Sequence, residues 1–172
     1  MNDWRQFEKT TMEMLAKEFE KLDIPVRLFE PDEQSPTYTL VALLEGMGEM
    51  EKQDVRLEML FLPLDEADRE VISFNYIQFF AVIKEDLEEA NYGKLMEFIN
   101  YVNSNIPVGT IGIATDSKLL YLKYCCPYLQ NMSPDLILEM TDTVLSIIIH
   151  ELNLYIDALI DVAEGRLGEG IH

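Results

Sequence analysis

The sequence is short of the residues on which most enzymes and metal sites depend. Two histidines, His150 and His172, and two cysteines occur in 172 residues. No cluster of histidine, cysteine or carboxylate residues has the spacing of a metal site. No serine lies in the Gly-x-Ser-x-Gly turn of a nucleophile elbow. We therefore expect no catalytic residues, no metal and no cofactor, and we expect that the protein is not an enzyme.

Basic residues are also scarce. Thirteen lysines and arginines stand against 32 acidic residues, which gives a formal net charge of −19. A surface this acidic repels nucleic-acid phosphates and anionic lipids. We expect neither nucleic acid nor a membrane as a partner. The charge favours solubility, and it also suits a protein partner that is basic or hydrophobic.

Long apolar runs are missing, because no stretch of about 18 or more consecutive apolar residues occurs. The N-terminal segment is charged and amphipathic, unlike a signal peptide. We expect a cytoplasmic protein. Cys125 and Cys126 are adjacent, so on a strand they point to opposite faces. We expect both to be reduced, structural thiols, in keeping with that compartment.

What the sequence does contain is one long apolar helix, predicted from Ser133 to about Arg166. Ser133 is suited to the N-cap and Pro134 to the first helical position. The polar positions fall on one narrow wedge of the helix. They are Asp135, Glu139, Asp142, Ser146, His150, Asn153, Asp157, Asp161 and Glu164.

The rest of this helix is apolar around about two thirds of its circumference, whereas an ordinary surface helix has one stripe a little over 100° wide. One stripe comprises Ile137, Met140, Val144, Ile148, Tyr155 and Leu159. The second comprises Leu138, Leu145, Ile149, Leu152 and Ile156. Leaving the second stripe in water would forgo about 1.5–3 kcal/mol per side chain. The helix therefore needs cover on two sides, from its own chain or from another subunit.

Periodicity predicts the other elements. Helices are expected at residues 3–22 and 88–105, and strands at 25–29, 37–44, 54–64, 71–83, 108–115 and 119–126. Strands joined by short turns are antiparallel, so the class is α+β. We expect an antiparallel sheet with helices packed on one face, in the order helix, three or four strands, helix, two strands, helix. Residues 1–165 form a single domain in this interpretation, and residues 166–172 a frayed C-terminal tail.

Three weaker polar features have structural explanations. The acidic loop at 65–70 lacks the glycine and the spacing of a calcium loop, so a solvated turn is expected. Gly109 and Gly112 precede a strand rather than a helix, which favours close backbone packing or a bulge over phosphate binding. Asn100 and Asn103 share one helix face. We expect them to bond backbone groups near the helix end, with a ligand contact as the alternative.

Four stretches together resemble the YbjN-type domain. They are residues 98–103, 108–113, 119–124 and 132–136. That family shows a pair of asparagines on a helix, then a hairpin, then a Leu-Ser-x-x-x-Leu entry to a last helix, where this chain has Met132. It is described as a bacterial sensory transduction regulator, and its fold is similar to that of type III secretion chaperones. The resemblance covers roughly residues 94–160 and implies a small, acidic, cytosolic homodimer that holds segments of other proteins.

Two functions remain open. The first is a non-enzymatic protein-binding module, chaperone-like or regulatory, which binds a protein partner or a second copy of itself through an apolar sheet and helix surface. The residues predicted for that surface are Leu60, Leu62, Leu145, Ile149, Leu152 and Ile156. The alternative is a small-ligand sensor with a pocket between the sheet and the last helix. Its expected lining is Phe74, Tyr76, Phe79, Phe98 and Tyr121.

Overall fold

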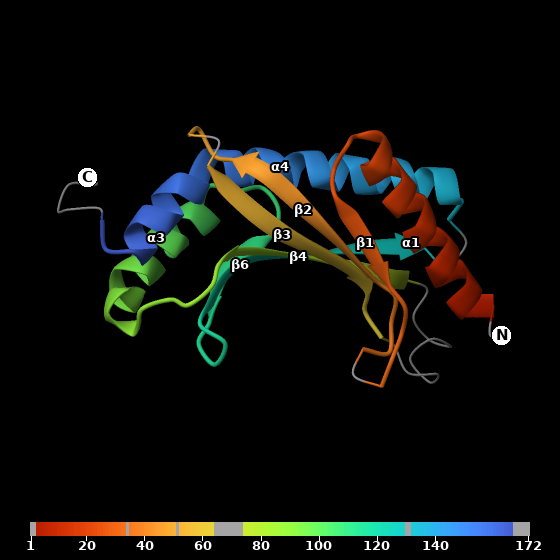
Figure 1. Ribbon diagram of the computed structural model, residues 1–172, viewed down its shortest axis with the longest axis horizontal. Coiled ribbons are helices and arrows are strands. Elements are labelled where there is room, and N and C mark those ends of the chain that lie inside the picture. Colours follow the sequence, from red (N-terminus) through yellow and green to blue (C-terminus); the bar gives the residue numbers. More distant parts are fainter. Residues whose placement is uncertain (1–2, 34, 51, 64–73, 130–131, 167–172) are drawn as a thin grey trace. The chain divides into compact units, whose positions relative to one another are not determined.

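The computed structural model describes residues 3–33, 35–50, 52–63, 74–129 and 132–166 (Figure 1). The helices are α1 (Asp3–Lys21), α3 (Tyr92–Asn103) and α4 (Pro134–Ala163), and a 3-10 turn, η1 (Glu89–Asn91), precedes α3. The strands are β1 (Val26–Phe29), β2 (Thr39–Met47), β3 (Gln53–Phe61), β4 (Phe74–Lys84), β5 (Thr110–Ala114) and β6 (Leu119–Leu129). The acidic loop at 65–70 lies outside the described residues.

The six strands form one antiparallel sheet in the order β1-β2-β3-β4-β6-β5. Val26 pairs with Ala42 at one edge, and Thr110 pairs with Lys123 at the other. The chain follows the order helix, four strands, helix, two strands, long helix. The predicted α+β class is therefore confirmed, with four strands rather than three before the second helix.

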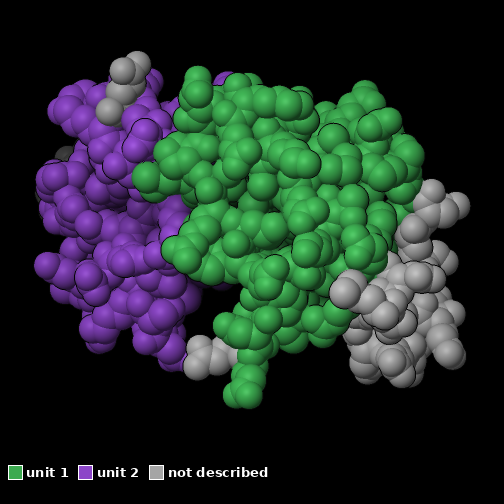
Figure 2. Space-filling model, turned by 45° about the vertical axis from the view of Figure 1, so that its right-hand side comes forward, with its two compact units in different colours: residues 1–43, 57–79, 125–145 green, residues 44–56, 80–124, 146–172 purple. Residues whose placement is uncertain are grey.

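The chain divides into two compact units (Figure 2). Unit 1 comprises residues 1–43, 57–79 and 125–145, and unit 2 comprises residues 44–56, 80–124 and 146–172. Strands β2, β3, β4 and β6 and helix α4 each contribute residues to both units. The single domain over residues 1–165 stays a prediction.

In unit 1, α1 and the first part of α4 pack on the same side of the strands. The ring of the buried Phe61 on β3 contacts Trp4 and Phe7 of α1, at centroid distances of 5.3 Å and 5.9 Å. The hydroxyl of Tyr128 on β6 lies 2.9 Å from that of Thr141 on α4, and both side chains are fully buried. This face of the strands is therefore the core of unit 1.

In unit 2, α4 holds the turn between β2 and β3 with its polar wedge. The Gly48 amide donates to Asn153 Oδ1 at 2.9 Å, and the Met50 amide donates to Asp157 Oδ2 at 3.3 Å. Gly48 has φ +91°, and a Cβ added there would lie 2.6 Å from Asp157 Oδ1. A glycine is therefore needed at this position for both reasons.

Most of the apolar surface predicted on α4 is buried. In the first stripe Ile137, Val144, Ile148 and Leu159 are buried, and in the second, Leu152 and Ile156 are buried while Leu138, Leu145 and Ile149 are half-buried. By length and composition alone, α4 is the one helix in the described part of the chain that could cross a membrane. Core helices of soluble proteins meet the same criterion, so this composition is weak evidence of a span.

Helices α1 and α4 end in the same way. After α1 the amides of Asp23 and Ile24 donate to the carbonyls of Glu20 and Phe19. After α4 the amides of Gly165 and Arg166 donate to those of Val162 and Asp161. Both are Schellman caps with a left-handed residue, at φ 56° for Asp23 and φ 68° for Gly165. Arg166, where the frayed tail was expected to begin, closes the second cap, and residues 167–172 lie outside the described residues.

The two caps predict opposite effects of substitution. Asp23→Gly should raise the free energy of unfolding by about 0.5–1 kcal/mol, because glycine adopts the left-handed conformation without steric cost. Gly165→Ala should lower it by about 1 kcal/mol, because it adds that cost. Urea denaturation of both variants checks this. A less stable Asp23→Gly protein would contradict the cap assignment.

Candidate functional site

One face of the strands in unit 1 carries large apolar side chains that the described residues leave partly exposed. Phe29, Leu43, Phe74 and Leu129 are 36–43% exposed. Burial alternates along each strand, so these residues lie opposite the core side chains. The half-buried residues of the same face are Val41, Leu60, Leu62 and Tyr76. We call these eight residues the open face of unit 1.

The open face carries little charge in a chain whose net charge is −19. Among the described strand residues on this side of unit 1, the charged ones are Arg27 and Glu58. The Arg27 guanidinium lies over the Phe29 ring, 4.6 Å from its centroid, so its cation stacks on the apolar surface. Five neighbouring strands contribute to this face. Contiguous exposed apolar patches on protein surfaces are often functional.

The six residues predicted for partner binding differ in how exposed their side chains are. Leu60 and Leu62 lie on the open face, and Leu145 and Ile149 are half-buried on α4. Leu152 and Ile156 are 1% and 0% exposed. These two side chains fill the core of unit 2, so they offer a partner no surface in this structure. The helix pattern could not separate them from Leu145 and Ile149, because all four share one stripe.

Of the four most exposed side chains of the open face, Phe29, Leu43 and Leu129 were not predicted, and Phe74 was predicted as pocket lining rather than as partner surface. A signal for them exists in the sequence. Strands 37–44, 54–64 and 71–83 are apolar at both alternating positions, which indicates that both faces are covered. The described helices cover one face of unit 1, and the described residues leave the other face partly exposed.

The expected lining of a ligand pocket is not assembled. Phe74 and Tyr76 belong to the open face, whereas Phe79 is fully buried on the opposite side of β4. Tyr121 and Phe98 belong to unit 2, where Phe98 stacks on Tyr101 at 6.0 Å. Within unit 1, Phe79 therefore does not share a cavity with Phe74 and Tyr76.

The two glycines near β5 serve backbone packing. Tyr121 lies across Gly112, with its hydroxyl oxygen 2.8 Å from the position of a Cβ, and it stacks on Phe80 at 4.9 Å. Gly112 pairs with Tyr121 in the sheet, so the ring covers a strand position that has no side chain of its own. Gly109 has φ +81° and lies against the Lys123 carbonyl oxygen.

Asn103 closes the edge of the sheet at β5. Its Nδ2 donates to the Ile111 carbonyl at 2.9 Å, and its Oδ1 accepts from the Ile111 amide at 2.8 Å. The side-chain amide takes the place that a neighbouring strand would occupy, which protects an edge from pairing with another chain. The expected bonds to backbone near the helix end are present for Asn103, and Asn100 is exposed.

Glu151 is a buried carboxyl group that the sequence interpretation missed. It is 3% exposed and lies on α4. Its Oε1 accepts from the Val108 amide at 3.5 Å, and its Oε2 has no hydrogen-bond partner among the described residues. Burial raises the pKa of Glu151, against the smaller opposing effects of the Val108 amide and of His150. The burial of Glu151 could have been predicted from its position, because residue 151 falls between Ile148 and Tyr155 on the first apolar stripe of α4.

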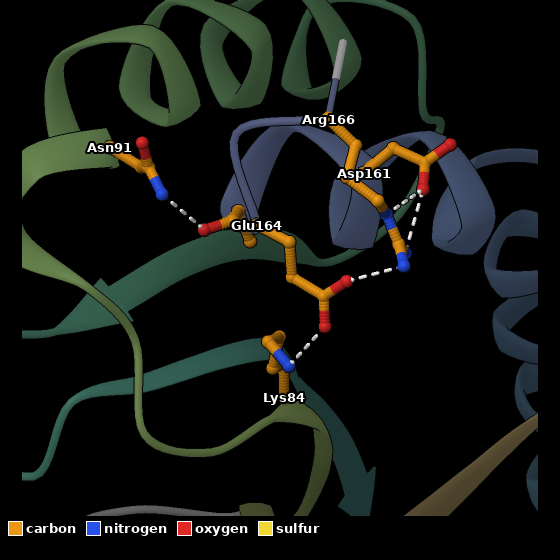
Figure 3. Close-up of polar contacts among 6 residues, drawn as sticks. Lys84, Asn91, Asp161, Glu164 and Arg166 are labelled. Atoms are coloured by element: carbon orange, nitrogen blue, oxygen red, sulfur yellow. Dashed lines mark hydrogen bonds and ion pairs between the residues drawn. The ribbon is translucent and has the colours of Figure 1, made fainter.

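A second polar cluster anchors the C-terminal end of α4 (Figure 3). Lys84 Nζ donates to Glu164 Oε1 at 2.7 Å, and Arg166 pairs with Asp161 and Glu164. Asn91 Nδ2 donates to the Ala163 carbonyl at 2.9 Å. The hydrogen bond from Lys84 lowers the pKa of Glu164. Every carboxylate here has a basic partner, so the cluster caps a helix and leaves no acid–base pair for catalysis.

The described ranges contain no group of three or more histidine, cysteine, aspartate or glutamate residues that could hold a metal ion. Cys125 is half-buried and Cys126 buried, and neither forms a disulfide. Comparison with protein-family models and with curated proteins finds no match for this chain. The open face of unit 1 is thus the candidate site that the described residues define.

Because Asn103 closes the edge at β5 and Asn100 does not, substitution of the two asparagines should change the free energy of unfolding unequally. Asn103→Ala should lower the free energy of unfolding by about 1–3 kcal/mol, because Ile111 loses the partners of both backbone groups. Asn100→Ala, the control on the same helix, should stay within about 0.5 kcal/mol of the parent. Urea denaturation measures both. Equal effects would show that the Asn103 bonds contribute nothing specific.

Proposed function

We propose that the chain is a non-enzymatic protein-binding module, chaperone-like or regulatory, whose partner docks on the open face of unit 1. The observation that carries the proposal is the exposure of Phe29, Leu43, Phe74 and Leu129, at 36–43%, on one face of the strands. Covering what remains exposed of each side chain is worth about 1 kcal/mol. A monomer leaves that stabilisation unused, whereas a partner with a complementary apolar surface would recover it.

The charge supports a protein as the partner. With a net charge of −19, phosphate-rich and anionic surfaces are repelled. The open face itself carries Arg27 and Glu58 among its described strand residues, so an apolar protein surface meets little desolvation cost there. A basic protein gains from the acidic surroundings, and a second copy of this chain meets a nearly neutral face. We propose a cytoplasmic location on the same charge argument.

We also propose a distant relationship to the YbjN-type domain. Its support is the element order, which has the second helix, the hairpin β5–β6 and the long last helix in sequence. The order differs from that of type III secretion chaperones by one strand, since four strands rather than three precede the second helix. The additional strand is consistent with β1, which is an edge strand of four residues.

The proposal is tested with charged substitutions on the open face. Leu43→Asp and Leu62→Asp should each abolish binding of a co-purifying protein, because a buried unpaired carboxylate is costly at an interface. The control is Leu154→Asp on α4, which makes the same charge change at a side chain that is 55% exposed in unit 2. Affinity capture with mass spectrometry measures binding, light scattering measures self-association, and thermal unfolding checks the fold.

Each outcome decides the proposal. Loss of the partner, or of the dimer, in both open-face variants and its retention in Leu154→Asp would support it. Retention in the folded Leu43→Asp and Leu62→Asp proteins would overturn it. So would a monomer that binds no protein and retains a small molecule through purification, which would favour the sensor function.

A further inference from the structure

We propose that Glu151 is a proton-controlled latch on the turn between α3 and β5. Loss of its proton favours opening of residues 107–109, and uptake of a proton favours the closed turn. This inference concerns unit 2 alone and is independent of the protein-binding proposal.

The turn between α3 and β5 is held at its ends and near its middle by hydrogen bonds of unequal length. Two short hydrogen bonds between Asn103 and Ile111, at 2.8 Å and 2.9 Å, fix the ends of the segment. The amides of residues 104–106 donate to carbonyls of α3 at 2.8–3.2 Å, so this half of the segment stays attached to the helix. Between the two ends, the Val108 amide reaches Glu151 Oε1 at 3.5 Å, beyond the usual 2.7–3.2 Å of a good N–H···O bond. Gly109, at φ +81°, gives the backbone freedom to move next to that contact. The Val108 contact is therefore the part of the turn that can open.

The carboxyl group is poorly satisfied when ionised. Glu151 is 3% exposed, and Oε2 lacks a hydrogen-bond partner among the described residues. A carboxylate has about four acceptor positions, and one weak bond fills little of that capacity. A buried charge without compensation is costly. The cost is removed either by protonation in the closed turn or by opening of the turn to water.

The neighbouring groups do not supply a buried counter-charge. His150 precedes Glu151 on α4 and is exposed, and Tyr155, one turn further on, is half-buried. Between residues 98 and 115 the one ionisable side chain is Tyr101, which is 58% exposed. On β6, Lys123 pairs with Thr110 and is exposed. The His150 charge favours the ionised carboxyl group but does not outweigh burial, which raises the pKa of Glu151.

The sign of the pH dependence follows from linkage. The closed turn raises the pKa of Glu151, whereas the open turn exposes the group to water and returns its pKa toward the ordinary value. The closed form therefore binds the proton more tightly. Between the two pKa values the opening constant rises up to about tenfold per pH unit as the pH increases. Below the ordinary pKa and above the raised pKa the opening constant is constant.

Hydrogen exchange of the full chain tests the latch. Protection factors for the amides of Val108 and Gly109, corrected for intrinsic exchange rates, are measured in pH steps from mildly acidic to neutral. In the parent protein they should fall by up to about tenfold per pH unit within the window. Glu151→Gln should remove that dependence. Glu139→Gln is the matched control, because it makes the same change at an exposed residue of the same helix, and it should keep the parental slope.

A carboxyl titration of the parent protein by carbon-13 NMR keeps the test decisive if Glu151→Gln does not fold. The latch predicts a Glu151 pKa above the ordinary value, and a Val108 amide shift that titrates with the same midpoint. An ordinary Glu151 pKa would overturn the proposal. Protection of the Val108 and Gly109 amides that is independent of pH in the parent, or a parental slope retained in Glu151→Gln, would overturn it as well.

Discussion

The burial of α4 is the constraint on which the rest of the structure depends. A 30-residue helix that is apolar around most of its circumference must be covered, and its residues fill the cores of both units. Its polar wedge does more than contact water. Asn153 and Asp157 accept hydrogen bonds from the turn between β2 and β3, so the wedge holds a backbone segment that is distant in sequence. Glu151 is the exception on this helix, because it places a buried carboxyl group on a stripe whose other members are apolar or aromatic and are buried or half-buried.

In unit 2, three asparagine side chains satisfy backbone groups that regular structure leaves over. Asn103 closes the edge of β5, and Asn153 accepts a hydrogen bond from the turn between β2 and β3. Asn91 donates a hydrogen bond to the Ala163 carbonyl in the last turn of α4. An amide suits these positions because it carries both donors and an acceptor without charge. Unit 1 differs, since its strands keep one apolar face exposed. The edges of unit 2 are thus closed by its own side chains, whereas the open face of unit 1 is available to another molecule.

Local periodicity predicted the elements well, and tertiary contacts decided the rest. The helix at 133–166 and the hairpin at 108–126 were located within a few residues, because apolar spacing is a local property. The partner of Asn153 could not be predicted, since that contact joins residues 105 positions apart. Periodicity also placed Leu152 and Leu145 on one stripe, although one is buried and the other half-buried. Which part of a stripe is covered depends on the neighbouring elements, and a helix pattern carries no information about them.

The central claim is that the open face of unit 1 is covered by a protein in its native setting. Hydroxyl-radical footprinting, applied to the purified chain and to the chain in fresh cell lysate, measures the accessibility of individual side chains. The account predicts that Phe29, Phe74 and Leu129 are labelled less in lysate, while Tyr101 and Leu154, which are 58% and 55% exposed in unit 2, are labelled equally. Equal labelling of the open face in both samples, or protection confined to Tyr101 and Leu154, would contradict it.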